Sequence, residues 1–144
     1  MSRRFASGSR TGVAAAVLVA VIAVVHLQQY IDFISEVPTI GVLFLLNAAG
    51  GAGLAVALLS GDRQLRLLAA VGSIGLAAAS LVSIVIALSG SLFGYSEPTL
   101  RLPILIAIIA EVAAIPVLVA LVIAALRDRS AVQPAPAATH RSSA

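Results

Sequence analysis

The sequence predicts an all-α protein: a four-helix transmembrane bundle whose N- and C-termini both lie in the cytoplasm. Three observations predict this fold, namely the composition, the lengths of the apolar segments and the placement of the arginines. Hydrophobic residues make up 60% of the 144 residues and charged residues 10%, whereas soluble domains carry about 25% charged residues. A short chain with a mean hydropathy of +1.10 cannot cover its surface with polar groups in water, so we expect its solvent to be lipid.

Four apolar segments are long enough to cross a bilayer as helices. They cover about residues 13–31, 39–59, 65–88 and 102–126. An α-helix rises about 1.5 Å per residue, so roughly 20 residues span a hydrocarbon core of about 30 Å. The sequence therefore predicts one membrane domain, residues 13–126, with four spans.

The residues at the segment boundaries are typical of helix ends. Pro38 suits the first turn of the second helix, and Pro103 the opening turn of the fourth. Between the second and third helices, Gly61 is expected as a C-cap and Asp62 as an N-cap. Inside the fourth segment, Pro116 removes one backbone hydrogen bond and is expected to kink the helix.

The two ends of the chain differ in composition from the membrane domain. Residues 1–12 are rich in Arg, Ser and Gly, and residues 127–144 are rich in Pro, Ala and Ser. Both are predicted to be disordered cytoplasmic segments. The first apolar segment ends in HLQQY, without a small-x-small cleavage pattern, so we interpret it as a retained helix.

The arginines set the predicted orientation. With both termini inside, the cytoplasmic side holds eight of the nine basic residues: Arg3, Arg4, Arg10, Arg63, Arg66, Arg127, Arg129 and Arg141. Only Arg101 then lies outside, in the connection that also holds Glu97. Because cytoplasmic loops carry an excess of positive charge, the sequence predicts a multi-pass protein of the cell membrane with both ends inside.

Small and polar residues share single faces of the predicted helices. The predicted packing positions are Gly50, Gly51, Gly53, Ser73 and Ala77. Small residues let helix backbones approach closely, and polar side chains there can bond across the interface. These faces, which also hold Asn47, Ser80 and Glu111, are therefore expected to point into the bundle.

Each of the four helices brings one polar side chain to the outer half of the membrane. Counted from the outer helix ends, Asn47 and Ser80 lie about 12 Å deep. Glu111 lies about 14 Å deep and His26 roughly 8 Å. These four residues form the candidate intramembrane polar site.

Glu111 is the strongest candidate of the four, because carboxylates inside membranes are costly and are functional by default. We expect Glu111 to be protonated or hydrogen-bonded near neutral pH, held by Asn47 or Ser80, with His26 above it toward the outer surface. A structural interpretation stays open, because a protonated Glu bonded to Asn47 would join two helices without any activity.

Several function classes find no support in the sequence. The chain has no Cys, which excludes thiol chemistry and Cys-ligated metals. The loops hold no catalytic constellation, and no cofactor or metal site is indicated. The net charge of +3 comes from Arg at the ends and loops, so nucleic-acid binding is not indicated. The GGAG run lies in a predicted helix and is a packing feature.

The stretches HLQQYIDF and PTIGVLFLLNAAGG, with an acidic residue in the last span, resemble a group of small four-span membrane proteins common in actinobacteria. The shared features are a His-Leu pair closing the first helix, a Gly-x-Leu-Phe-Leu-Leu opening to the second and a Glu in the fourth. Here these are His26 and Leu27, residues 41–46, and Glu111. The resemblance covers roughly residues 24–120 and implies the four-span topology, but no established activity.

The sequence thus favours an accessory or interaction protein with no indicated enzymatic activity. Its expected partners are the lipid bilayer and either a second copy of the chain or another membrane protein. The alternative is a small carrier or sensor for a proton, a cation or a small polar ligand, which would bind in the pocket formed by the candidate polar site.

Overall fold

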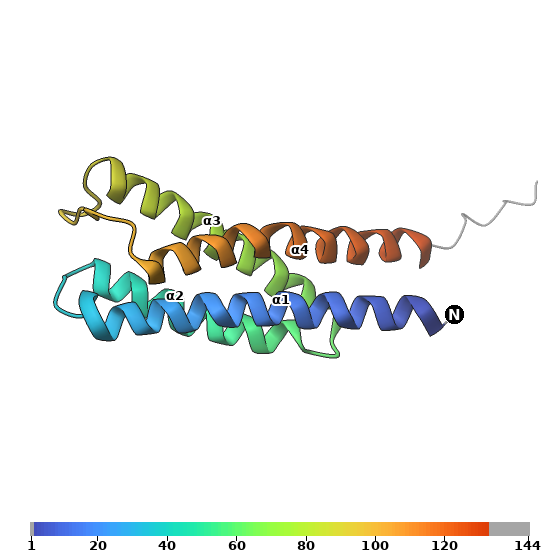
Figure 1. Ribbon diagram of the computed structural model, residues 1–144. Helices are drawn as coiled ribbons and strands as arrows, with labels where there is room; N and C mark the ends of the chain where they lie inside the picture. The colour runs from blue at the N-terminus through green and yellow to red at the C-terminus, as the bar shows by residue number, and fades with distance from the viewer. Residues whose placement is uncertain (1, 133–144) are drawn as a thin grey trace, which may run out of the picture.

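The protein folds into four long helices that run side by side (Figure 1). The computed structural model describes residues 2–132, with side-chain positions for residues 10–128. The elements in chain order are α1 (Ser2–Gln29), the π-helical turn η1 (Tyr30–Ile34), α2 (Ile40–Leu58), α3 (Arg63–Ser89) and α4 (Leu102–Val132). Every regular element in this part of the chain is helical, which confirms the predicted all-α four-helix bundle.

All four helices are long and apolar enough to cross a membrane, as a multi-pass membrane protein requires. Their membrane-crossing parts are Arg10–Ile34, Ile40–Leu58, Arg63–Ser89 and Leu102–Asp128. These bounds differ from the predicted spans by at most three residues, at 10 against 13 and at 34 against 31. The hydropathy pattern therefore located the spans well.

Two helices extend beyond the predicted membrane domain. α1 begins at Ser2, whereas residues 1–12 are predicted above to be disordered, and α4 continues past the predicted end at 126 to Val132. Once a span has formed a helix, each added residue gains a backbone hydrogen bond at little further cost, and Arg, Ala and Leu favour the helix. The predicted disorder of residues 133–144 lies outside the described part of the chain.

Successive helices alternate in direction, so the start of α1 and the end of α4 lie at one end of the bundle, here called the inner end (Figure 1). The opposite, outer end holds the connection between η1 and α2 and that between α3 and α4. α1 packs against α2 and α4, and α3 packs against the same two helices, so the helices form a ring. α2 and α3 have the smallest contact of the four adjacent pairs. In Figure 1, α3 crosses the bundle obliquely and its outer end lies away from α2.

The turn between α2 and α3 confirms one predicted cap and corrects the other. The Asp62 carboxylate accepts a hydrogen bond from the backbone N–H of Leu65 at 2.8 Å, so Asp62 is the N-cap of α3 as predicted. The C-cap of α2 is Leu59 and not Gly61, because α2 ends at Leu58, two residues earlier than predicted from the position of the glycine.

The chain enters α2 through a tight turn. Pro38 precedes the N-cap residue Thr39, which has a φ of 66°, so Pro38 lies before the first helical turn and not in it. Gly41 then lies directly against the end of η1. A Cβ atom at Gly41 would lie 2.8 Å from the backbone oxygen of Ile34, so this close approach requires glycine.

Helix α4 contains both predicted prolines. Pro103 lies in its first turn, as expected, where the missing N–H has no helical partner to lose. The helix continues through Pro116, which cannot donate to the carbonyl of Val112. The kink expected at Pro116 stays a prediction.

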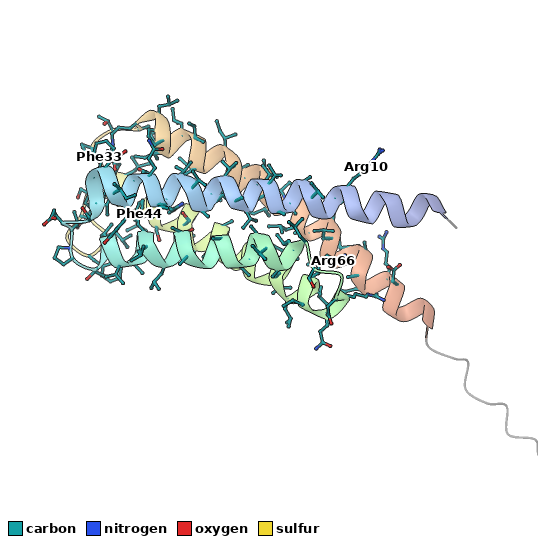
Figure 2. All side chains as sticks on the ribbon, turned by 90° about the horizontal axis from the view of Figure 1, so that it is seen from below. Arg10, Phe33, Phe44 and Arg66 are labelled. Atoms are coloured by element: carbon teal, nitrogen blue, oxygen red, sulfur yellow. The ribbon has the colours of Figure 1, made fainter. Side chains whose placement is uncertain are left out.

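The inner half of the bundle is closed by a buried apolar cluster that is rich in alanine. Its buried cluster consists of Ala15, Ala16, Val19, Ile22, Ala55, Leu58, Ala69, Ala70, Ala110, Ala114 and Leu118. Arg63 of α3 donates to the backbone carbonyl of Ala125 in α4 and so joins these two helices at the inner end. Figure 2 shows Arg10 and Arg66 toward this end and Phe33 and Phe44 toward the other.

Both termini are expected in the cytoplasm, because eight of the nine arginines then lie on that side. Alkaline phosphatase, which is active only outside the cytoplasm, should be inactive when fused at Ser2 or Ala144 and active when inserted at Ser91. Green fluorescent protein at the same three positions should give the reverse pattern. Phosphatase activity at both termini and none at Ser91 would contradict the orientation.

Candidate functional site

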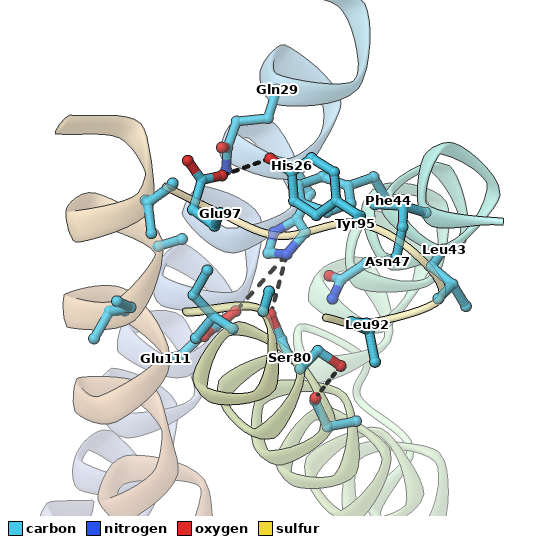
Figure 3. Close-up of a pocket in the computed structure, with 18 of the residues that line it drawn as sticks. His26, Gln29, Leu43, Phe44, Asn47, Ser80, Leu92, Tyr95, Glu97 and Glu111 are labelled. Carbon is cyan, nitrogen blue, oxygen red and sulfur yellow. Dashed lines mark hydrogen bonds and ion pairs between the residues drawn. The ribbon is translucent and has the colours of Figure 1, made fainter. Parts of the chain in front are cut away.

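A cavity of about 270 Å³ lies in the outer half of the bundle (Figure 3). Its walls come from all four helices and from the connection between α3 and α4, residues 90–101, called the outer loop below. Most of its surface is apolar, but eight lining residues are polar: His26, Gln29, Asn47, Ser80, Ser83, Tyr95, Glu97 and Glu111. One water molecule takes up about 30 Å³ of liquid, so the cavity has room for a small molecule.

The structure brings the four predicted site residues to this one cavity. His26 lies in the centre: its Nε2 atom is 3.1 Å from Oγ of Ser80 and 3.9 Å from Oε1 of Glu111. Figure 3 shows these two interactions as dashed lines, with Asn47 facing the same space from α2. The residues come from four different helices, one from each.

The hydrogen bonds of His26 establish which ring nitrogen carries the proton. Nδ1 lies 2.9 Å from the backbone oxygen of Ile22, one turn earlier on α1. A carbonyl oxygen only accepts, so Nδ1 carries the hydrogen and donates it. In the neutral ring Nε2 is then the acceptor, and the Ser80 hydroxyl donates to it. The basic nitrogen of His26 therefore faces Glu111.

The imidazole ring is also held by packing. Its centroid lies 5.1 Å from that of the Phe44 ring on α2, with a tilt of 40° between the two planes. His26 is 5% exposed. Contacts to α1, α2 and α3 thus fix both the position and the orientation of the ring.

Two polar atoms in the cavity wall have no partner among the described residues. Glu111 is 1% exposed, and its Oε1 forms no hydrogen bond. Oδ1 of Asn47 is also buried without a partner, so Asn47 does not hold Glu111 in the way predicted. Ser80, the other predicted partner, lies beside the carboxyl group. Most buried polar atoms in proteins are hydrogen-bonded, and a ligand in the cavity would supply the partners that these two oxygens lack. Among the described residues, Arg63 Nε and Ser73 Oγ are also buried without a partner, but they lie outside the cavity.

The outer loop covers the outer side of the cavity. It begins with a tight hairpin in which the backbones of Leu92 and Tyr95 exchange hydrogen bonds of 2.8 and 2.9 Å. The two residues at the tip, Phe93 and Gly94, have φ angles of 51° and 84°, as in the primed hairpin turns. The backbone N–H of Glu97 donates to a carbonyl in the last turn of α3 at 3.0 Å, which folds the loop back over the bundle.

Glu97 holds the outer loop in place through its carboxylate. Oε2 accepts a hydrogen bond of 2.6 Å from the Tyr95 hydroxyl and forms an ion pair of 2.9 Å with Arg101. The Arg101 guanidinium lies over the Phe33 ring, 4.5 Å from its centroid, and so connects the loop to η1. Glu97 itself is 6% exposed.

The charges of this cluster are stable at neutral pH. Burial, and next the hydrogen bond to Glu97, raise the pKa of Tyr95 to about 12, so Tyr95 stays protonated and keeps donating. The hydrogen bond to Glu97 likewise raises the pKa of Arg101. Arg101 therefore stays charged and keeps its ion pair with the Glu97 carboxylate.

Four polar lining residues lie outside the set predicted from the sequence: Gln29, Ser83, Tyr95 and Glu97. Gln29 follows His26 by three residues on the same helix face, and this spacing was the signal for it. Glu97 and Arg101 have the spacing of an i, i+4 ion pair, but they lie in a predicted loop. Their position over the cavity depends on the hairpin, which the sequence does not reveal.

The predicted packing positions divide between the interior and the surface. Gly51, Ser73 and Ala77 are buried in the bundle. Gly50 and Gly53 are exposed, and a Cβ atom at Gly53 would meet no atom within 4 Å. The packing role predicted for Gly53 is therefore wrong within a single chain, because this residue lies on a different face of α2 from Gly51.

The site can exchange protons and bind a polar group. The Ser80 hydroxyl and the Glu111 carboxyl lie 3.1 and 3.9 Å from the basic ring nitrogen of His26. A proton can pass between Glu111 and His26 over this distance through a small movement or a bridging water. In the described part of the chain, no group of three or more His, Cys, Asp or Glu residues could hold a metal ion.

No protein-family model matches the chain, and no curated protein or solved structure matches it either. The resemblance to the small four-span proteins of actinobacteria stays a prediction. Function must therefore be argued from the cavity itself.

Proposed function

We propose that this protein is a carrier or sensor of the cell membrane, whose outer cavity binds a proton, a cation or a small polar ligand. The observation behind the proposal is the convergence of polar side chains from four helices on one cavity in which Oε1 of Glu111 is left without a partner. If these side chains only joined helices, their buried polar atoms would be hydrogen-bonded to one another between the helices, since each unpaired atom costs about 1–3 kcal/mol of stability.

The protonation state of His26 also affects its contacts with the neighbouring helices α3 and α4. While the His26 ring is neutral, Ser80 of α3 donates to its Nε2 atom. A proton arriving at Nε2 makes this atom a donor, so the Ser80 hydroxyl must rotate and accept instead. The resulting imidazolium faces the Glu111 carboxylate at 3.9 Å, and the pair joins α1 to α4 electrostatically. Protonation of the cavity thus adds a link between α1 and α4 to the bond that His26 keeps with α3, and so couples proton binding to helix packing as a sensor or carrier requires.

Glu111 is expected to exchange its proton with the solution while the protein stays folded. Infrared difference spectra of the purified protein in lipid, recorded as the pH is raised from 5, should show a single buried carboxylic acid band that is lost. The same spectra of Glu111→Gln should lack this band and keep the amide bands of the helices. A Glu111 carboxylate band that persists down to pH 5 in the absence of a bound cation would contradict the proposal.

The interaction role predicted from the sequence is the second candidate. It is supported by Gly53 on α2 and Gly75 on α3, which are exposed and would have open space around a Cβ atom. Exposed glycines let a helix of a second copy or of another membrane protein approach closely. This candidate assigns no role to the unpaired atoms of the cavity, and we rank it second for that reason.

A further inference from the structure

The cavity is closed toward α1 and α4 and open toward α2 and α3. Five of its six lining residues on α1 and α4 are buried, among them His26 at 5% and Ala107 at 6% exposed, and the sixth, Ile108, is partly buried. On α2, the lining residues Leu43 and Leu46 are 41% and 61% exposed, and Ala79 facing them on α3 is exposed as well. The opening therefore lies between α2 and α3, the adjacent pair with the smallest contact, at the level of the apolar spans.

The outer loop closes the direct route from water to the cavity. Tyr95, Glu97 and Arg101 are bonded to one another above the polar site, and Arg101 ties them to Phe33 on η1. The side opening is flanked by leucine and alanine and faces the region where lipid chains lie. A ligand that uses this opening must be soluble in lipid, at least in part.

The charges around the cavity favour a cation over an anion. Glu97 is already paired with Arg101 at 2.9 Å, and no Arg or Lys lines the cavity among the described residues. Glu111 faces His26 from α1 at 3.9 Å, and the nearest side chains of α2 and α3 in the polar site, Asn47 and Ser80, carry no charge. A carboxylate in a buried apolar site attracts a positive group and repels a second negative one.

We infer that the cavity binds a small amphiphilic monocation of the alkylammonium type, which arrives from the outer leaflet through the opening between α2 and α3. This inference rests on the proposed function and names its substrate class. The ammonium group pairs with the Glu111 carboxylate and donates to Oδ1 of Asn47, which supplies the partners that both oxygens lack. The alkyl chain lies against Leu43, Leu46 and Leu76.

Binding of the cation displaces a proton. When Glu111 is protonated, the ammonium group takes the place of that proton, which leaves to the solution, so the charge of the cavity is unchanged. The protein then binds alkylammonium more tightly as the pH rises, by up to tenfold per pH unit while Glu111 is protonated in the free protein. His26 is the other titratable group that faces Glu111, whereas Tyr95 stays protonated and Arg101 stays charged near neutrality and Glu97 is paired with Arg101.

The inference is tested with three six-carbon probes that differ only in the head group: hexylammonium, hexanol and hexanoate. Isothermal titration calorimetry with the full chain in detergent should show binding of hexylammonium and none of hexanoate. Titrations in two buffers of different ionisation enthalpy should show the release of up to one proton per hexylammonium. Glu111→Gln should weaken hexylammonium binding by at least tenfold and abolish the proton release.

The route through the side opening is tested with a matched pair of variants on α3. Ala79→Phe places a large side chain in the opening, whereas Ala78→Phe adds the same side chain at a neighbouring exposed position that does not line the cavity. In stopped-flow measurements, Ala79→Phe should slow the association of hexylammonium by tenfold or more, and Ala78→Phe should leave the rate unchanged. If Ala79→Phe does not fold, Leu46→Trp on the facing helix makes the same test.

Each outcome decides one part of the inference. Hexanoate binding as tight as that of hexylammonium would overturn the cation assignment, and equal effects of the two phenylalanine variants would overturn the side route. Tight binding of hexanol alone would show an apolar site in which Glu111 has no part. If no probe binds but Glu111 still exchanges its proton in the infrared experiment, this inference fails and the proposed function stands. If Glu111 does not exchange its proton either, both fail.

Discussion

The Glu111→Met variant is expected to be more stable than the wild-type protein, by about 1–3 kcal/mol, and to have lost all proton and cation binding in the cavity. Methionine is similar in length to glutamate and has no group that needs a strong hydrogen bond. Glu111 is 1% exposed and its Oε1 has no partner, so the substitution removes the penalty of a buried unpaired atom. Thermal unfolding in detergent, followed by circular dichroism, measures the stability, and calorimetry with hexylammonium measures the binding.

Glu111→Gln is the matched control for this experiment. Its amide keeps a donor and an acceptor, so its stability should stay close to that of the wild type while binding is still lost. A Glu111 that served only to join helices would behave in the opposite way. Methionine would then destabilise the protein more than glutamine does, and this result would reject the functional role of the carboxyl group.

Gly51→Leu is expected to destabilise the bundle by about 1–3 kcal/mol or to prevent folding. A Cβ atom at this position would lie 3.1 Å from Cβ of Ala23 on α1 and 3.5 Å from Cδ2 of Leu76 on α3. The three remaining carbons of leucine would need still more room, so α1 and α2 would have to separate. The midpoint of thermal unfolding in detergent should fall accordingly.

Gly53→Leu is the control for the same substitution on the same helix. A Cβ atom there meets nothing within 4 Å, so the leucine projects toward lipid and the unfolding midpoint should change little. Ala55 is not a suitable control, because it follows Gly51 by four residues and shares its buried face. Equal losses of stability for Gly51→Leu and Gly53→Leu would contradict the observed α1–α2 contact.

The spans and the four-residue site could be predicted because both depend on local regularities. About twenty apolar residues form a helix that just crosses the membrane. Because the spans alternate in direction, counting residues from the outer end of each helix shows which side chains lie at the same depth. Asn47, Ser80 and Glu111 were assigned to the bundle interior because each is flanked by small residues on a face that packs, and all three line the cavity. The pairing of His26 with Ser80 needs the rotation of each helix as well, which the sequence leaves undetermined.

The outer loop could not be predicted, because its conformation depends on contacts between residues that are distant in the chain and not on local regularities. Its conformation depends on the bonds of Glu97 to Tyr95 and Arg101 and on the contact of Arg101 with Phe33, a residue more than sixty positions earlier in the chain. Such contacts form only after the helices have packed. Gly53 shows a related limit, because glycines on opposite faces of one helix look alike in a sequence and differ only once a neighbouring helix is present.

The closed inner half makes the site responsive to the membrane potential. In the proposed orientation, charges reach Glu111 from the outer side, because the alanine-rich cluster fills the inner half. Glu111 lies about 14 Å into a hydrocarbon core of about 30 Å, so a cation that binds to an already ionised Glu111 crosses roughly half of the electric field, whereas the exchange of a cation for a proton moves no net charge. One elementary charge that crosses the whole field gains about 2.3 kcal/mol per 100 mV, and half of this is roughly a sixfold change in affinity. At a pH at which Glu111 is ionised, a cell with a negative interior therefore holds its cation at Glu111 more tightly than a cell that has lost its potential.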